Sequence, residues 1–167
     1  MKTVFLVRHA KSSWGDPSQP DLLRPLNKRG LHDAPVMGKH LAKLGVQPDL
    51  IVSSPAARAI ATAQLLAPWL GYPPGKVLTD DRLYGTTADE IQTVLSEMDS
   101  RKECVMLIGH NPMLDELVDR FTSGKVTHLP TCGVVSLEFT ASGWSEISLV
   151  KPNRVKFYRP KASKENL

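Results

Sequence analysis

The amino-acid sequence predicts an α/β fold, a three-layer αβα sandwich with a largely parallel central sheet and an antiparallel hairpin at the C-terminal end. Short apolar runs alternate along the chain with longer segments whose apolar residues recur at helical spacing, which is the pattern of strand–helix–strand units. The chain has 167 residues, 41% of them hydrophobic and 23% charged, so it can bury one core without disulfide support. We expect one domain over residues 1–151 and a basic tail over residues 152–167.

Four short runs of β-branched and other apolar residues are expected to form the parallel strands. They cover residues 3–7, 50–52, 76–78 and 105–108. Runs of this kind are typical of strands that are buried on both faces of a sheet. The antiparallel hairpin is expected over residues 134–140 and 144–150, joined across residues 141–143.

Helices are expected between these strands. The segments with helical spacing of apolar residues are 31–44, 55–70, 91–98 and 112–121. Pro35 must either kink the first of these helices or lie near its start. Ser54-Pro55 and Asn111-Pro112 each combine an N-cap residue with proline at the first helical position, so each pair is expected to begin a helix. A long connection rich in Ser, Asp and Pro covers residues 10–26.

The positive charge of the chain is concentrated at its C-terminal end. The net charge is +4, and residues 151–167 hold six basic residues against Glu165 alone, a balance of +5. Residues 1–150 therefore carry a balance of −1. We expect the basic segment to be a solvated tail, and the alternative is a patch that binds an acidic partner. Because the excess charge lies outside the predicted domain, we expect no nucleic-acid partner.

Several classes of protein are disfavoured by features that the sequence lacks. No apolar run approaches the ~20 residues of a membrane-spanning helix, and the apolar stretch at residues 4–7 is too short for a secretory signal peptide. Cys104 and Cys132 give neither a disulfide framework nor a four-ligand zinc set. His32 and His40 are eight positions apart and form no metal pair. We therefore expect a cytoplasmic protein with no membrane partner, no cofactor and no metal.

Polar side chains with catalytic potential follow three of the predicted strands. Arg8 and His9 end the first strand, Arg58 lies in the first turn of the helix after the second, and His110 ends the fourth. Because ligands of open α/β sheets bind at the carboxyl ends of strands, we expect these side chains to converge. Arginine suits phosphate oxygens, histidine can act as a nucleophile, and helix N-termini favour anions. The sequence therefore predicts a pocket for a phosphoryl group.

At these residues the sequence resembles the histidine phosphatase superfamily, also called phosphoglycerate mutase-like. Val7-Arg8-His9-Ala10 is similar to the family's Arg-His-Gly signature, with alanine in place of the usual glycine. Residues 53–59, Ser-Ser-Pro-Ala-Ala-Arg-Ala, resemble its second motif, and residues 108–111, Ile-Gly-His-Asn, resemble its late histidine motif. The short length and Arg24-Pro25-Leu26 look most like the SixA-type phosphohistidine phosphatases, in which the arginine corresponding to Arg24 helps to form the anion pocket.

The resemblance implies a mechanism. His9 is expected to attack phosphorus in line and to become a phosphohistidine, which water then hydrolyses. Arg8 and Arg58 are expected to hold the phosphoryl oxygens, and a protonated His110 to complement the charge of the transition state. Ser12 is expected either to be a weak oxygen ligand or to make an ordinary turn hydrogen bond. No metal is required, since the arginines supply the positive charge.

An acidic residue that larger members of the family carry is absent from the corresponding place in this sequence. They have a glutamate or aspartate after the third strand that protonates the leaving group, whereas residues 83–86 read Leu-Tyr-Gly-Thr. The nearby acids are expected to be solvated residues of loops or helix starts, and they are Asp16, Asp21, Asp80, Asp81, Asp89 and Glu90. An enzyme without a strong acid should prefer leaving groups that depart easily, such as the imidazole of a phosphohistidine.

The expected function is therefore a phosphatase for protein phosphohistidine or another labile phosphate. Only 52 positions separate Arg58 from His110, which leaves little room for an enclosing insertion and favours a phosphorylated protein or a small substrate with a protruding phosphate. Two alternatives stay open, a small-molecule (sugar) phosphate phosphatase or mutase and a non-catalytic phosphate-binding module. The two histidines favour the enzyme, because binding alone needs no nucleophile. The sequence does not indicate the oligomeric state.

Overall fold

The computed structural model describes residues 1–160 and confirms the predicted α/β class. One six-stranded sheet has the strand order β3-β2-β4-β1-β5-β6. The strands are β1 (Lys2–Arg8), β2 (Leu50–Ser53), β3 (Leu78–Thr79), β4 (Cys104–Gly109), β5 (Val134–Phe139) and β6 (Arg154–Tyr158). The first four are parallel to one another, whereas β5 is antiparallel to both β1 and β6. The sheet is therefore largely parallel, with antiparallel strands at one edge.

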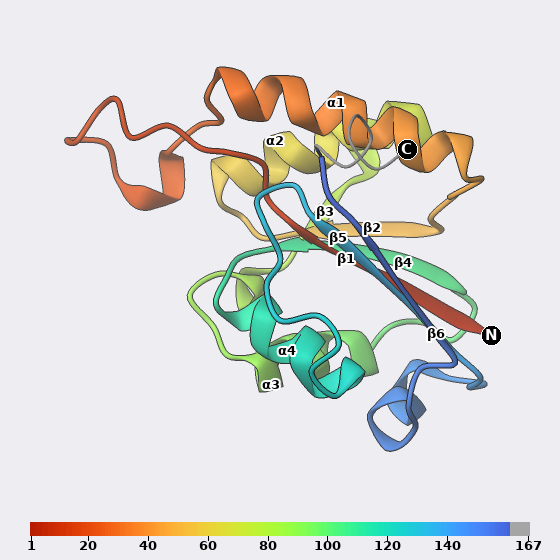
Figure 1. Ribbon diagram of the computed structural model, residues 1–167. Helices are drawn as coiled ribbons and strands as arrows, with labels where there is room; N and C mark the ends of the chain where they lie inside the picture. Colours follow the sequence, from red (N-terminus) through yellow and green to blue (C-terminus); the bar gives the residue numbers. More distant parts are fainter. Residues whose placement is uncertain (161–167) are drawn as a thin grey trace.

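Helices cover both faces of the sheet (Figure 1). The helices α1 (Lys28–Lys43) and α2 (Ala57–Leu66) lie on one face, and α3 (Ala88–Ser96) and α4 (Met113–Thr122) lie on the other. Short 3₁₀ helices cover Asp21–Leu23, Ala67–Leu70, Pro74–Lys76, Asp81–Leu83 and Trp144–Leu149. The alternation of strands and helices thus produces the predicted three-layer sandwich.

The central strand β1 contributes to the core on both sides of the sheet. Val4 and Leu6 belong to the apolar cluster that α3 and α4 cover, whereas Phe5 and Val7 belong to the cluster that α1 and α2 cover. Successive side chains of a strand point to opposite faces, so a strand between two helical layers must be apolar at every position. This explains the continuous apolar run at residues 4–7.

The register of the sheet aligns the carboxyl ends of β1, β2 and β4. Arg8 pairs with Gly109, and beyond this pair the main-chain N–H of His9 donates to the Gly109 carbonyl at 3.1 Å. On the other side of β4, the main-chain N–H of Ser54 donates to the Ile108 carbonyl at 2.9 Å. The residues that follow these three strands therefore emerge together at one edge of the sheet.

The start of α1 differs from the prediction. Asn27 caps the helix by accepting a hydrogen bond from the main-chain N–H of Gly30 at 2.9 Å, so the helix begins at Lys28 rather than near residue 31. Pro35 consequently lies inside α1 and not near its start.

The helices α2 and α4 also begin at different residues from those predicted. Ser54 accepts a hydrogen bond from the N–H of Ala56 at 3.1 Å, but α2 starts only at residue 57. Asn111 accepts one from the N–H of Asp115 at 3.1 Å, and α4 starts after the cis peptide bond between Asn111 and Pro112. Ser54 thus stabilises the turn before α2, whereas Asn111 accepts from an N–H in the first turn of α4, and neither residue is the N-cap.

The predicted C-terminal hairpin is wrong in its second strand. Residues 144–149 form a 3₁₀ helix, and the strand that pairs with β5 is β6. Because a 3₁₀ helix repeats every three residues, Trp144 and Ile147 fall on one face, and both are buried. The strand β6 lies in the segment predicted to be a solvated tail, so the sheet continues at least to Tyr158. Residues 161–167 of that tail lie outside the described residues.

The third strand is only two residues long, Leu78–Thr79, because the residues before it, Pro74–Lys76, form a 3₁₀ turn. Cys104 and Cys132 are both free thiols. Within residues 1–160, no helix combines the length and the apolar character that a membrane crossing requires.

Candidate active site

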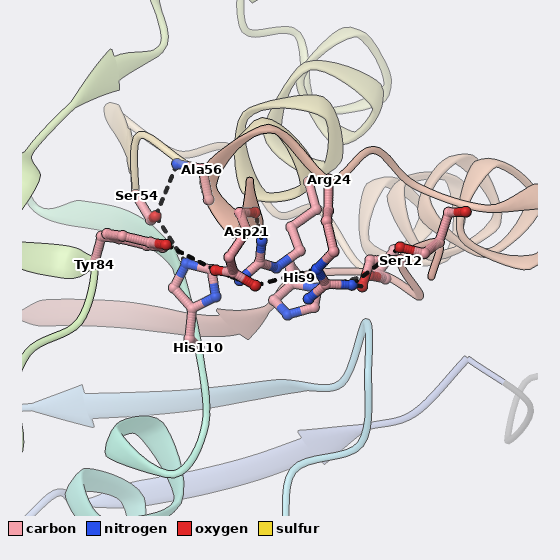
Figure 2. A network of polar contacts seen from close by, with 11 residues as sticks. His9, Ser12, Asp21, Arg24, Ser54, Ala56, Tyr84 and His110 are labelled. Carbon is pink, nitrogen blue, oxygen red and sulfur yellow. Dashed lines mark hydrogen bonds and ion pairs between the residues drawn. The ribbon is translucent and has the colours of Figure 1, made fainter. Parts of the chain in front are cut away.

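The structure brings the six predicted site residues together in one pocket of about 490 Å³ at the carboxyl edge of the sheet. These residues are Arg8, His9, Ser12, Arg24, Arg58 and His110. They come from the end of β1, the long connection after it, the start of α2 and the end of β4. Figure 2 shows His9 and His110 below Asp21, with Arg24 and Ser12 beside them.

His9 is held in a single orientation with one ring nitrogen available. The residue is buried, and its Nδ1 lies 2.6 Å from the Ala10 carbonyl oxygen. The Nδ1–H therefore donates to this oxygen, and Nε2 keeps its lone pair. Burial lowers the pKa of His9 to about 4, with smaller contributions from neighbouring arginines such as Arg58. A neutral imidazole with a free Nε2 is the form that can attack phosphorus.

Ala10, in the place of the family's usual glycine, fits without strain. The only non-glycine residues with positive φ in the described part of the chain are Ser123 and Cys132. The N–H of Ala10 donates to the Thr62 hydroxyl at 2.9 Å, and that hydroxyl donates to the Arg58 carbonyl at 2.7 Å. These hydrogen bonds tie the end of β1 to the first turns of α2.

Arg8 and Arg58 retain donors after their contacts with the protein. Nη1 of Arg8 donates to the Leu129 carbonyl at 3.2 Å. Nη1 and Nη2 of Arg58 donate to the main-chain oxygen and Oδ2 of Asp21 at 2.7 and 3.0 Å. The Nε–H of each arginine is buried and has no acceptor among the described residues. The donors available to an anion are the remaining Nη N–H groups, because each guanidinium carries five N–H groups and both arginines line the pocket.

Arg24 reaches the pocket from the long connection, as predicted. Its Nη1 donates to the Ser12 hydroxyl at 2.7 Å and its Nε donates to Oδ1 of Asp21 at 3.1 Å. The guanidinium also stacks over the Trp14 ring, with Cζ 3.5 Å from the ring centroid. Ser12 thus accepts a hydrogen bond from Arg24, which makes it a support for that arginine.

His110 faces His9, and the centroids of the two rings are 5.1 Å apart. Its Nε2 lies 2.8 Å from the Ser54 hydroxyl. Burial, followed by the nearby His9 and Arg58, lowers the pKa of His110 to about 3. The side chain is therefore neutral at pH 7 in the ligand-free protein, which differs from the protonated His110 expected from the resemblance. A phosphate dianion beside the ring would raise this pKa, because a negative charge favours the protonated form.

Asp21 and Tyr84 belong to the pocket but were not predicted to do so. Asp21, expected to be a solvated loop acid, forms ion pairs with Arg24 at 3.1 Å and Arg58 at 3.0 Å and accepts a hydrogen bond from the Tyr84 hydroxyl at 2.7 Å. The Tyr84 ring lies edge-on to His110, with centroids 5.6 Å apart. The spacing of three residues between Asp21 and Arg24 was a usable signal, since one 3₁₀ turn places such a pair on the same face.

Comparisons with known proteins agree with this geometry. The family described as the histidine phosphatase superfamily (branch 1) matches residues 4–86. A solved structure described as a phosphohistidine phosphatase SixA, from Agrobacterium tumefaciens, is 28% identical with a TM-score of 0.74, covering 81% of this chain and 90% of that chain. The protein histidine phosphatase SixA complexed with tungstate has a TM-score of 0.78 at 21% identity, covering 97% and 99% of the two chains, and shows the shared fold.

Two further proteins extend the comparison. The mycobacterial glucosyl-3-phosphoglycerate phosphatase has a TM-score of 0.64 at 18% identity, covering 95% of this chain and 97% of that chain. An uncharacterized chloroplastic protein of Arabidopsis thaliana is 32% identical over 153 residues, covering 87% of this chain and 70% of that protein. The range matched by the family model contains Arg8, His9, Arg24 and Arg58, which the structure gathers in the pocket with His110. From its sequence, its fold and this pocket, the chain belongs to the histidine phosphatase superfamily.

Proposed function

We propose that this protein is a metal-independent phosphatase that transfers the phosphoryl group of its substrate first to His9 and then to water. One observation carries the proposal, the placement of a nucleophile beside buried anion-binding donors. Nε2 of His9 has a free lone pair, and Arg8 and Arg58, which line the same pocket, keep Nη N–H groups that have no acceptor among the described residues. A module that only binds phosphate would need the arginines but not the oriented imidazole.

The two chemical steps balance with the groups in the pocket. In the first step the bond between Nε2 of His9 and phosphorus forms while the bond to the leaving atom breaks, and the leaving atom keeps the electron pair. In the second step water attacks phosphorus, the Nε2–P bond breaks, and inorganic phosphate departs with the oxygen of the water. The positive charges of Arg8, Arg24 and Arg58 compensate the phosphoryl oxygens in both transition states.

The acid–base groups of the pocket favour a labile phosphate as substrate, with protein phosphohistidine as the first choice. Residues 83–86 contain Tyr84 but no carboxylate. The hydrogen bond from Tyr84, followed by those from Arg58 and Arg24, holds the pKa of Asp21 well below its ordinary value, so this acid is ionised at neutral pH. The leaving group must then depart largely without a donated proton. The imidazole of a phosphohistidine departs readily under these conditions, whereas the alkoxide of a sugar does not.

The arrangement of the chain around the pocket supports a phosphate carried by a protein. Between Arg58 and His110 the chain forms the rest of α2, the strands β3 and β4, the helix α3 and three short 3₁₀ turns. All of these belong to the sandwich, so this part of the chain adds no separate cap domain. The solved structures described as SixA phosphohistidine phosphatases support the same choice.

A second candidate function is the hydrolysis of a small sugar phosphate. It is favoured by the likeness in fold to the mycobacterial glucosyl-3-phosphoglycerate phosphatase, which extends over 95% of this chain. In this case the leaving group would be an alkoxide, and the pocket would have to supply a proton that the ionised Asp21 does not carry.

A panel of substrates separates these candidates. We expect kcat/KM to be much higher for protein phosphohistidine and phosphoramidate than for 3-phosphoglycerate or glucose 6-phosphate. Across aryl phosphates of graded phenol pKa, kcat/KM should fall steeply as the leaving-group pKa rises, because negative charge builds on the leaving oxygen in a loose transition state. Equal efficiency on the sugar phosphates would establish the second candidate. Binding of inorganic phosphate without turnover of any substrate would identify a binding module.

A further inference from the structure

Asp21 is the only carboxylate among the residues that line the described pocket. Its two carboxylate oxygens are held from three directions, by Arg24 on Oδ1 and by Arg58 and Tyr84 on Oδ2. The main-chain oxygen of the same residue accepts a further hydrogen bond from Nη1 of Arg58 at 2.7 Å. Figure 2 shows the Asp21 carboxylate between Tyr84 and Arg24, in the same group of side chains as His9 and His110. Four contacts therefore fix Asp21, and with it a negative charge, in the pocket that His9 also lines.

The Asp21 carboxylate is also accessible from the pocket. Its side chain is 49% exposed, whereas the side chains of Arg24 and Arg58 that it contacts are 8% and 6% exposed. The two arginines are thus buried, whereas Asp21 lines the pocket with a side chain that solvent, and therefore a substrate, can reach. A charge at this position interacts with the substrate through a medium of lower effective dielectric constant than bulk water.

A phosphate dianion and Asp21 together offset most of the positive charge that lines the pocket. Arg8, Lys11, Arg24 and Arg58 contribute four positive charges, a phosphate dianion contributes two negative charges and Asp21 contributes one, which leaves a balance of +1. His9 and His110 are neutral in the ligand-free protein. The part of the substrate next to the phosphate therefore meets Asp21 as the only fixed anion among the residues that line the described pocket. A cationic group there is attracted and an anionic group is repelled.

We propose that Asp21 determines the charge of the leaving group that this pocket accepts. It favours phosphorylated groups that are cationic or that present an N–H, such as the imidazolium form of a phosphohistidine, and it disfavours phosphates that carry a second anion close by, such as phosphoglycerate. This inference rests on the proposed phosphatase function and names the feature of the pocket that selects its substrates.

The test uses three phenyl phosphates that differ only in a 4-substituent, namely a cationic aminomethyl, a neutral hydroxymethyl or an anionic carboxylate group. We expect kcat/KM of the wild-type protein to decrease in that order. In Asp21→Asn, which keeps the size of the side chain and removes its charge, the ratio between the cationic and the anionic substrate should fall about tenfold. In Asp21→Glu, which keeps the charge, most of the preference should remain.

Asp16→Asn is the matched control, because Asp16 lies in the same connection, bonds to Ser18 and does not line the pocket. We expect it to leave all three values of kcat/KM unchanged. If Asp21→Asn changes the three substrates by one common factor, Asp21 only positions the arginines or competes with phosphate, and the proposal is wrong. If the wild-type protein hydrolyses none of the three substrates and no phosphoramidate, the proposed function itself fails, which is a separate outcome.

Discussion

His9 shows how the surroundings of one residue select its chemistry. The hydrogen bond between Nδ1 and the Ala10 carbonyl fixes the tautomer, and burial keeps the ring neutral, so Nε2 is a nucleophile at physiological pH. We expect His9→Ala to abolish turnover of every substrate while the protein stays folded and still binds tungstate. Acid-labile radioactive phosphate should be trapped on the wild-type protein and not on the variant. Activity of His9→Ala near the wild-type level would show that another residue attacks phosphorus.

Arg58 illustrates why an arginine rather than any cation is needed at this position. Two of its five N–H groups donate to Asp21, and the remaining Nη N–H groups are left for phosphate oxygens. A lysine ammonium has its three N–H groups on one atom, so it cannot hold Asp21 and phosphate in the same geometry. We expect Arg58→Lys and Arg58→Ala each to lower kcat/KM by ~10²-fold or more. Inhibition by vanadate should weaken in both variants. Full activity of Arg58→Lys would show that charge alone is sufficient.

The residues of the site differed in how well the sequence predicted them. Arg8, His9 and His110 follow buried strands directly, so recognising the strands was enough to place them at one edge of the sheet. Asp21 and Tyr84 lie in a short 3₁₀ helix and at the end of another, where no apolar periodicity restricts their position. Their place in the pocket depends on contacts between segments 63 residues apart, which local patterns do not encode.

At the scale of the elements, the N-terminus of α1 supports the loop that follows His9. The carbonyl of Lys11 accepts a hydrogen bond from the N–H of Asn27 at 3.0 Å, and a Cβ atom on Gly30 would overlap this carbonyl. We expect Gly30→Ala to lower the free energy of unfolding by roughly 1–3 kcal/mol and to reduce kcat/KM, since the loop must move. Gly75→Ala is the control, because its Cβ would meet nothing within 4 Å. Equal stability of the two variants in urea would contradict this account.

The strand β6 gives a second prediction about an element. The sequence alone predicts a solvated tail from residue 152 onward, whereas the structure pairs β6 with β5 and packs Val155 and Phe157 against the core. We expect a chain that ends at Lys151 to lose roughly 2–4 kcal/mol of stability, from lost apolar burial and strand pairing. A chain that ends at Pro160 keeps all of β6 and serves as the control. Equal denaturation midpoints for the chains that end at Lys151 and at Pro160 would mean that this segment behaves as the solvated tail that the sequence predicts.

The same region shows which elements the sequence could and could not predict. The strands β1, β2 and β4 were predicted because each contains a short, continuous apolar run, and a helical segment follows each of them along the chain. Residues 144–149 contain only three apolar residues, of which Trp144 and Ile147 are buried and Leu149 is largely exposed. A spacing of three between buried residues suits a 3₁₀ helix, and a strand would need a spacing of two. The strand β6 was not predicted, because charged residues alternate with apolar ones in it and it lacks the continuous apolar run of a buried strand. An edge strand tolerates such charged residues.

At the scale of the whole molecule, the buried histidine pair makes folding sensitive to pH. The pKa values of His9 and His110 are lowered to about 4 and about 3 in the folded protein, mainly by burial, whereas histidine in an unfolded chain titrates near 6.5. At a pH between the folded-state and the unfolded-state pKa values, the two histidines are protonated in the unfolded chain and neutral in the folded protein. As far as these two histidines are concerned, the free energy of unfolding therefore has its full value above about pH 6.5 and decreases as the pH falls toward 4.

We accordingly expect the free energy of unfolding to decrease between pH 6 and pH 5, by up to about 1.4 kcal/mol per pH unit for each of the two histidines. Urea denaturation of the wild-type protein and of the His9→Asn, His110→Asn double variant, measured at intervals of half a pH unit, gives the two slopes. The slope of the double variant should be smaller, because neither asparagine takes up a proton in the unfolded state. Equal slopes would mean that the folded protein protonates both rings near the ordinary pKa of histidine. A neutral His9 would then be lost as the nucleophile just below pH 7, and the activity would fall at the same pH.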